Sequence, residues 1–135
     1  MKQSQQLSVP MTLVTLDIDH FKDISDTYGH NVGDDVLCHI SKLLKHRTRK
    51  MDRAFRLGGE EFLVLLHGTN QEIGQQIAED LRRRISLLAL FSERSVTVSV
   101  GVASLELNED WISWMKRSDQ NLYRAKAAGR NRVEG

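Results

Sequence analysis

The chain has 135 residues, of which 40% are hydrophobic and 27% charged, and its net charge is +1. This composition predicts one globular domain with its own core and excludes a disordered or fibrous chain. The near-neutral charge gives no indication of a surface for nucleic-acid polymers. No apolar run in the sequence is long enough to span a membrane, and a single cysteine, Cys38, excludes a disulfide framework. We therefore expect a cytoplasmic domain without membrane contact, in which Cys38 is buried or half-buried.

The first predicted strand ends in two acids. Residues 1–10 are polar, and we expect them to be disordered or the remnant of a trimmed helix, with the folded domain over residues 11–135. Residues 11–19 alternate between two faces in the manner of a strand. Asp17 and Asp19 lie at its end and on the same side.

A short helix, a loop and a longer helix are predicted next. Residues 20–27 are expected to form a short helix or turn, and residues 28–33, which contain two glycines, a loop. An apolar stripe predicts a helix over residues 34–47, with Asp34 and Asp35 at its start, where acids complement the helix dipole.

A glycine pair joins two strand-like runs in the middle of the chain. Residues 53–57 and 61–66 flank Gly58 and Gly59. Such a pair predicts a two-residue hairpin, because tight hairpin turns need positive φ at their centre. Glycines at the tip also allow phosphate groups to approach the backbone closely.

The remainder of the chain predicts two helices and one or two strands. Thr69 and the acid three residues later have capping-box spacing ahead of a helix. Residues 95–104 alternate as a strand, with valines on one face and small residues on the other. A last helix begins at Asp110 and stops at Gly129, and residues 131–134 are expected to add an edge strand.

The predicted order is β-α-β-β-α-β-α with a short final strand. Two helical crossovers and a central hairpin predict an α+β ferredoxin-like sandwich, in which helices flank an antiparallel-rich sheet. In this arrangement the hairpin tip lies beside the end of the first strand. The tip would therefore bring Glu60 and Glu61 close to Asp17 and Asp19.

Four acids at one place repel one another unless a cation is bound. The pattern therefore predicts a divalent metal, most readily Mg²⁺, between carboxylates and phosphates. Adjacent strand residues point to opposite faces, so we expect one of Glu60 and Glu61, preferably Glu60, to hold metal with Asp17. The other is freer to accept a proton. Lys126 and Arg130, four residues apart, would share a helix face if the helix reaches that far, and would stabilise a phosphoryl group.

Each of these features taken alone has a plainer interpretation. The hairpin also fits an ordinary turn followed by solvated acids. The basic pair also fits a solvated helix end that complements the dipole.

Five motifs, in order between residues 11 and 133, resemble the successive signatures of the GGDEF family of diguanylate cyclases. No single one is specific, but the five in this order are. The third is the Glu variant of the motif that gives the family its name. They are Asp-Ile-Asp-His-Phe-Lys from Asp17, Asp-x-Tyr-Gly-His-x-x-Gly-Asp from Asp26, Arg-x-Gly-Gly-Glu-Glu-Phe from Arg56, Thr-Val-Ser-Val-Gly from Thr97, and Asp-x-x-Leu-Tyr-x-Ala-Lys-x-x-Gly-Arg-Asn-Arg from Asp119.

The resemblance implies the fold of nucleotide-cyclase and polymerase palm domains. It implies a head-to-head homodimer in which each domain holds one GTP with Mg²⁺ (or Mn²⁺), and which forms cyclic di-GMP and pyrophosphate. By position, Asp17, the Ile18 carbonyl and Glu60 would hold metal, and Glu61 or Glu60 would deprotonate the 3′-hydroxyl. Substrate binding is implied for Phe21, Lys22, Ser25, His30, Asp34, Gly58, Gly59, Lys126 and Arg130.

The resemblance also implies a site for product inhibition at Arg49 and Asp52. Two departures from the family pattern stand out. The family usually has Asn where this chain has Ser25, and Ser reaches less far toward the guanine edge, so we expect weaker GTP binding or looser purine selectivity. The family's opening helix and its Asp-x-Leu-Thr segment are absent, so we expect an excised catalytic domain that is fused to a sensory or regulatory domain in the full-length protein.

Three functions remain open at this point. The first and preferred one is an active diguanylate cyclase. The second is a catalytically weak or inactive receptor that binds cyclic di-GMP at Arg49 and Asp52, and Ser25 favours it. The third is a GTP-binding domain that regulates a fused phosphodiesterase.

Overall fold

A computed structural model of the chain describes residues 9–88 and 95–135. The elements in chain order are β1 (Met11–Ile18), α2 (Phe21–Tyr28), α3 (His30–Arg47), β2 (Arg53–Gly58), β3 (Glu61–His67), α4 (Gln71–Ser86), β4 (Val98–Ser104), α5 (Trp111–Ala127) and β5 (Arg132–Glu134). Within these residues the strands form one sheet in the order β2-β3-β1-β4-β5. All neighbouring strands pair antiparallel except β4 and β5, which are parallel. The predicted α+β sandwich and the predicted edge strand are confirmed.

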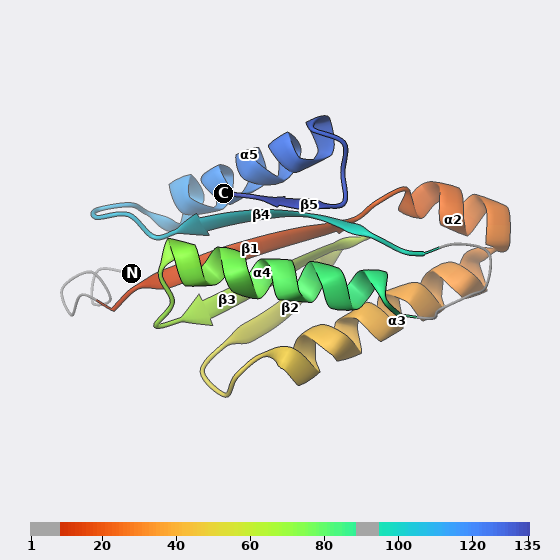
Figure 1. Cartoon of the computed structure of the whole chain (residues 1–135), viewed down its shortest axis with the longest axis horizontal. Helices are drawn as coiled ribbons and strands as arrows, with labels where there is room; N and C mark the ends of the chain where they lie inside the picture. The colour runs from red at the N-terminus through yellow and green to blue at the C-terminus, as the bar shows by residue number, and fades with distance from the viewer. Residues whose placement is uncertain (1–8, 89–94) are drawn as a thin grey trace.

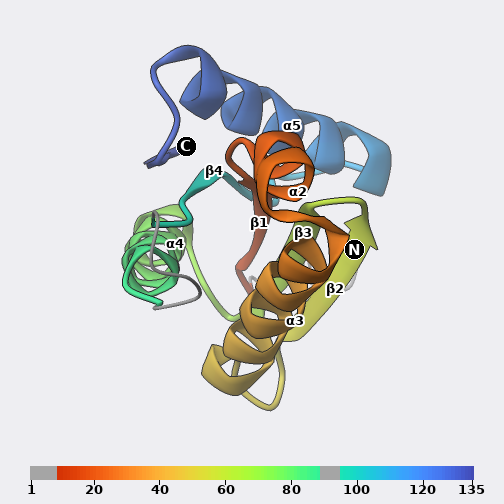
Figure 2. The same cartoon turned by 90° about the vertical axis from the view of Figure 1, so that its right-hand side faces the viewer.

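Helices cover both faces of the sheet (Figure 1). Helices α3 and α4 lie on one face and α5 lies on the other, while α2 lies at the end of the sheet where β1 finishes (Figure 2). The larger core lies under α3 and α4 and includes Val14, Leu16 and the valines of β4. A smaller core around Trp114 lies under α5. The alternation of β1 therefore assigns its two faces to two different helical layers.

Helix α5 packs directly against the sheet backbone. A Cβ at Gly101 of β4 would collide with the backbone of Ser118 and Leu122 on α5. The hydroxyls of Thr15 and Ser118 share a buried hydrogen bond of 2.6 Å across the same interface. The small residues predicted on one face of β4 are therefore the residues that admit α5.

The end of α5 is closed by backbone hydrogen bonds. The Arg130 N–H donates to the Ala125 carbonyl over 2.9 Å, and the Gly129 N–H donates to the Lys126 carbonyl over 3.3 Å. This pair of bonds, with Gly129 at a φ of 125°, is a Schellman motif. The predicted stop at Gly129 is confirmed.

The loop predicted over residues 28–33 is wrong, because α3 already begins at His30. Only Gly29, with a φ of 99°, separates α2 from α3. Gly33 serves helix packing instead of a loop, since a Cβ there would lie 3.3 Å from Phe21 Cζ. Asp34 therefore lies in the second turn of α3 and not at its start.

Cys38 is exposed, which corrects the expected burial. The core-facing residues of α3 are Val36, Leu37, Ile40 and Leu44, and Cys38 falls between them on the outer side. The small apolar side chain of Cys38 did not predict its burial, because its position along the helix decides whether it faces the core or solvent.

The start of α4 also differs from the prediction. Its N-cap is Asn70, whose side chain accepts from the Ile73 N–H over 2.9 Å. The Thr69 hydroxyl is not a cap, because it donates to the His67 carbonyl and accepts from Arg49.

The hairpin turn is shifted by one residue from the predicted glycine pair. Gly58 still pairs with Glu61, after a register shift that follows Arg56, so the turn residues are Gly59 and Glu60. Of the N-terminal segment predicted over residues 1–10, residues 1–8 lie outside the described residues, and the Pro10 carbonyl accepts from the Thr69 N–H. None of the helices in the described ranges is both long and apolar enough to cross a membrane.

Candidate active site

The tip of the β2–β3 hairpin lies beside the end of β1, as predicted. Asp17 is directly opposite Glu61 in the pairing of β1 with β3, and the Ile18 N–H donates to the Glu60 carbonyl over 3.2 Å. The two tip glycines have positive φ angles of 145° and 52°. Among the described residues, nothing lies within 4 Å of the position that a Cβ would take at either glycine, so a ligand can approach this backbone.

Asp17 is a buried acid with one lysine partner. It is 7% exposed, and its Oδ2 accepts from Lys126 Nζ over 2.5 Å. Burial raises the pKa of Asp17, the Lys126 ammonium lowers it, and the charges of Glu60 and Asp19 raise it again, so the pKa lies above its ordinary value. One lysine does not fully offset burial and repulsion, and a second cation would stabilise the carboxylate further.

Asp19 lines the same cavity as Asp17 and Glu60, as predicted, and also has a structural role. Its carboxylate accepts from the hydroxyls of Ser99 (2.6 Å) and Thr97 (2.7 Å) and from the Asn131 N–H (3.0 Å). These bonds join the end of β1 to the start of β4 and to the turn after α5. Asp19 therefore lies near the other acids, as expected, with its carboxylate bound by internal donors.

The donor set at the tip fits Mg²⁺ or Mn²⁺. Within the described residues no group of three or more His, Cys, Asp or Glu side chains forms a metal cage. Mg²⁺ does not need one, because it keeps several waters and binds one or two carboxylates together with substrate phosphates. Asp17, Ile18, Asp19 and Glu60 line one cavity of about 180 Å³, and within it Asp17 and Glu60 offer two carboxylates beside the Ile18 backbone.

Glu61 lies on the α5 side of the sheet, opposite Asp17. Burial raises its pKa, the nearby charges of Asp17, Asp119 and Glu60 raise it further, and Lys126 lowers it, with a net upward shift. A carboxylate with a raised pKa is a better proton acceptor than an ordinary one. Glu61 is therefore suited to act as a general base.

The cavity that holds the acids also has a side that is suited to bind an anion. It is lined by His20, Phe21 and Lys22 at the start of α2, and by Lys126 and Arg130. Free N–H groups at a helix N-terminus bind anions well, and the two cations add to this. The carboxylates and the phosphate-binding groups thus share one cavity.

Lys126 and Arg130 reach this cavity by a different route from the predicted shared helix face. Helix α5 ends at Ala127, and Arg130 has a left-handed φ of 66° in the following turn. The Schellman closure and the Asn131 bond to Asp19 hold that turn beside the cavity. Lys126 contacts Asp17, so its ammonium is shared between the acid and any phosphate.

Ser25 and His30 meet at the junction of α2 and α3. The Ser25 hydroxyl and His30 Nδ1 share a hydrogen bond of 3.0 Å, and a Cβ at Gly33 would lie 3.4 Å from Ser25 Oγ. Asp34 lies one turn after His30 and lines a separate pocket with Arg56. The structure therefore brings Ser25 and His30 together but places all three outside the 180 Å³ cavity.

Arg49 and Asp52 bind each other. Arg49 Nε donates to Asp52 Oδ2 over 2.9 Å, Arg49 Nη2 donates to Oδ1 over 3.0 Å, and the backbone N–H groups of Arg49 and His67 also donate to this carboxylate. Burial alone would raise the pKa of Asp52, but these hydrogen bonds outweigh it and the pKa is lowered. The Asp52 side chain is 2% exposed and that of Arg49 is 56% exposed, so Arg49 is the accessible partner.

The comparison with known families agrees with this geometry. A family model described as "Diguanylate cyclase, GGDEF domain" matches residues 1–132. The chain belongs to the GGDEF family.

Two similar proteins are much longer than this chain. Diguanylate cyclase DgcM of Escherichia coli (strain K12) is 43% identical over 133 residues, which are 97% of this chain and 32% of DgcM. Diguanylate cyclase DgcP of Pseudomonas aeruginosa is 46% identical over 127 residues, which are 92% of this chain and 19% of DgcP. The chain therefore spans about a third or less of the length of these curated relatives.

A solved structure of the same family is similar over almost the whole domain. The active GGEEF domain of a diguanylate cyclase from Vibrio cholerae has a TM-score of 0.92 at 36% identity, covering 98% of this chain and 86% of that one.

Asp119 is the site residue that the sequence reasoning missed. It lies on α5, where its charge raises the pKa of Glu61, and burial raises the pKa of Asp119 itself. Asp119 precedes Lys126 by seven residues, two helical turns, so helical periodicity places both on one side of α5. That spacing could have identified it.

Proposed function

We propose that this GGDEF domain condenses two GTP molecules into cyclic di-GMP and releases two pyrophosphates. The observation that supports this most is a single cavity in which Asp17, Ile18 and Glu60 lie beside Arg130 and the start of α2. Carboxylates for a divalent metal and positive groups for a triphosphate are the two requirements of nucleotidyl transfer. The similarity to named diguanylate cyclases selects GTP as the nucleotide.

The residues of the cavity divide the binding of a metal-nucleotide complex between them. Asp17, the Ile18 carbonyl and Glu60 would hold Mg²⁺ or Mn²⁺, which when bound neutralises phosphate charge and polarises the α-phosphate. The N–H groups of Phe21 and Lys22 would bind the β- and γ-phosphates. Arg130 and Lys126 would stabilise the negative charge that builds up on the departing pyrophosphate. Gly58 and Gly59 would let the nucleotide lie against the hairpin backbone.

Glu61 or Glu60 would accept the proton of the attacking 3′-hydroxyl. The 3′-oxygen forms a bond to the α-phosphorus of the other GTP, and the bond from that phosphorus to the pyrophosphate oxygen breaks. A second such step closes the ring: the 3′-oxygen of the other nucleotide attacks the α-phosphorus of the first, and the second pyrophosphate leaves. Because nucleophile and target belong to two GTP molecules held by two hairpins, two copies of the domain must face each other.

The nucleoside would lie against the junction of α2 and α3. Ser25, His30 and Asp34 are the polar side chains there that we assign to the base and ribose. The Ser25 hydroxyl already bonds to His30, which leaves it less able to bind the base. We therefore infer weaker base recognition than an Asn at this position would give.

We also propose that Arg49 and Asp52 form an inhibitory site for cyclic di-GMP. Arg49 lines a cavity of about 310 Å³ and is exposed, so its guanidinium can turn toward a phosphate, whereas Asp52 is held by internal donors. Arg49→Ala should keep the initial rate and abolish inhibition by product. Inhibition as strong as in the wild type would contradict this assignment.

A catalytically weak receptor for cyclic di-GMP or GTP is the second candidate, and the engaged Ser25 hydroxyl is the observation that favours it. One experiment separates the two. The domain fused to a parallel coiled coil is incubated with GTP and Mg²⁺, and the products are separated by chromatography. Cyclic di-GMP and pyrophosphate would support the cyclase. Intact GTP together with micromolar binding of cyclic di-GMP would support the receptor.

The length of the relatives supports a further part of the proposal. We infer that this domain is joined to a sensory or regulatory domain that controls how two copies meet. The DgcM chain of Escherichia coli is about three times as long as the region it shares with this one, and the additional length would carry that function.

A further inference from the structure

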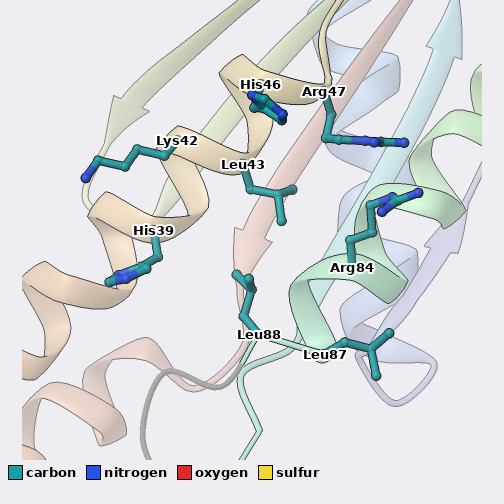
Figure 3. A pocket seen from close by; sticks show the side chains of 8 residues that line it. All are labelled: His39, Lys42, Leu43, His46, Arg47, Arg84, Leu87 and Leu88. Atoms are coloured by element: carbon teal, nitrogen blue, oxygen red, sulfur yellow. The ribbon is translucent and has the colours of Figure 1, made fainter.

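A groove of about 730 Å³ lies between α3 and α4, well away from the 180 Å³ active-site cavity, and the proposed cyclase reaction does not use it. Its apolar lining consists of Leu43 from α3 and of Leu87 and Leu88, which directly follow α4. Figure 3 shows Leu43 and Leu88 between the two helices. Leu87 is 76% exposed, which leaves an apolar side chain available to a binding partner.

The rim of this groove is positively charged. Lys42 and Arg47 come from α3 and Arg84 from α4 (Figure 3). Asp80 is the acid next to the rim, and it bonds to Arg84 over 2.9 Å and to Arg47 over 3.5 Å. Arg47 and Arg84 therefore share one carboxylate, and within the described part of the chain no ion-pair partner of Lys42 is found.

The cationic and ionisable residues on the α3 side have helical spacing. His39, Lys42 and His46 lie at positions i, i+3 and i+7 and all line the groove. Seven residues of helix span about 10 Å, so the α3 side of the rim presents these polar side chains along a line of that length. The apolar lining runs between this line and the Arg84 side.

We propose that the groove binds an acidic amphipathic helix of a partner protein. Such a helix would place leucine-like side chains on the apolar lining at i, i+3 or i+4, and i+7, and would place Asp or Glu beside Lys42 and Arg84. A small anion would bind the rim but would leave Leu87 and Leu88 exposed. A membrane surface is flat and cannot enter a groove between two helices, whereas a helix can.

Helix α3 connects this groove to both sites described above. It begins at His30, carries Asp34 in its second turn, and ends just before Arg49. A bound helix would therefore contact the element that carries the assigned nucleoside residues and leads to the assigned product site. Binding itself does not depend on the cyclase function, so the two proposals can fail separately.

The test uses an 18-residue stapled helical peptide with leucines on one face and glutamates beside them, titrated into the ¹⁵N-labelled chain. We expect saturable amide shifts confined to the C-terminal half of α3 and the last turn of α4. Lys42→Glu and Leu87→Ser should each weaken binding, the charge reversal by about tenfold. Lys45→Glu is the matched control, because it makes the same charge change on the same helix but does not line the groove.

Several results would overturn the proposal. One is the absence of shifts at millimolar peptide. A second is equal binding by a peptide with Gln in place of every Glu, and a third is equal weakening by Lys45→Glu and Lys42→Glu. A fourth is that phosphatidylglycerol vesicles shift the same amides while the peptide does not, which would assign the groove to a membrane surface. Spectra of each variant without peptide establish that it is folded.

Discussion

Two buried aspartates, each paired with one cation, behave in opposite ways in this domain. Asp52 accepts four hydrogen bonds from Arg49 and His67, and its pKa is lowered. Asp17 has Lys126 at 2.5 Å but also faces Glu60 and Glu61 across the hairpin tip, and its pKa is raised. The loop that carries Asp52 satisfies its charge internally, whereas the hairpin tip does not.

This difference indicates where a charged ligand stabilises the protein. An acid whose donors are all internal is held in place and contributes to the fold. An acid with a raised pKa and acidic neighbours gains most when a cation binds. Experiments on the two aspartates, and on the polar pair formed by Ser25 and His30, test this difference.

The largest expected effect is on turnover at the tip. Asp17→Asn, Glu60→Ala and Glu61→Ala should each reduce formation of cyclic di-GMP by at least about a hundredfold, because each removes a metal ligand or the general base. Product is measured by chromatography on coiled-coil-fused protein. Glu72→Gln, an exposed change on α4, is the control and should keep full activity. Full activity in any of the three variants would remove that residue from the mechanism.

The second effect is on stability at the Arg49 loop. Asp52→Asn should lower the free energy of unfolding by about 1–3 kcal/mol, since it weakens four hydrogen bonds to a buried carboxylate. Urea denaturation measures this. Asp80→Asn is the matched control, because its side chain is 45% exposed and its ion pairs should contribute less than about 1 kcal/mol. Equal losses of unfolding free energy in the two variants would show that the hydrogen bonds of Asp52 contribute no more to stability than an exposed ion pair.

The third effect concerns recognition of the base. Ser25→Asn should lower the KM for GTP and raise the preference for GTP over ATP, each by about 2- to 10-fold, which corresponds to one recovered hydrogen bond of about 0.5–1.5 kcal/mol. Steady-state kinetics with both nucleotides would measure it. If neither the KM nor the GTP/ATP ratio changed, Ser25 would have no part in recognising the base.

The smallest effect is on the pH dependence of stability. The raised pKa of Asp17 means that the folded state takes up a proton first as the pH falls, so the wild type gains stability relative to Asp17→Asn between pH 7 and about 4. The lowered pKa of Asp52 means that its contribution is present above about pH 4 and is lost below it. As the pH falls, the unfolding free energies of the wild type and Asp17→Asn should therefore approach each other between pH 7 and about 4. Those of the wild type and Asp52→Asn should approach each other only below about pH 4. Convergence in the reverse order would contradict the assigned shifts.

Sequence patterns predicted the sheet and the place of the site well. Alternation along β1 and the glycine pair were sufficient to bring Asp17 opposite Glu61. Alternation also placed Asp19 on the side of Asp17, and Asp19 lines the same cavity. The pattern did not predict that Ser99, Thr97 and the turn after α5, which are distant in sequence, bind its carboxylate.

Two other differences arise from packing that sequence patterns do not contain. Gly33 was interpreted as a loop residue, but it lies inside α3, where Phe21 of α2 leaves no room for a side chain. Arg130 was expected to share a helix face with Lys126 if the helix reached that far, but the Schellman motif ends the helix at Ala127 and carries Arg130 into the following turn. In each case the neighbouring helix or turn decides where the residue lies.

Gly101 has a consequence for the charges of the site, although it touches none of them. Because a methyl group there would collide with the backbone of Ser118 and Leu122, Gly101 determines how closely α5 approaches the sheet. Asp119 and Lys126 are carried by the same helix, one just after Ser118 and the other just after Ala125. The separation between Lys126 and the acids of β1 and β3 therefore depends on the residue at position 101 in the sheet beneath α5. A larger residue at position 101 would alter the proton affinity of Glu61 and Asp17 without any change to the ionisable groups themselves.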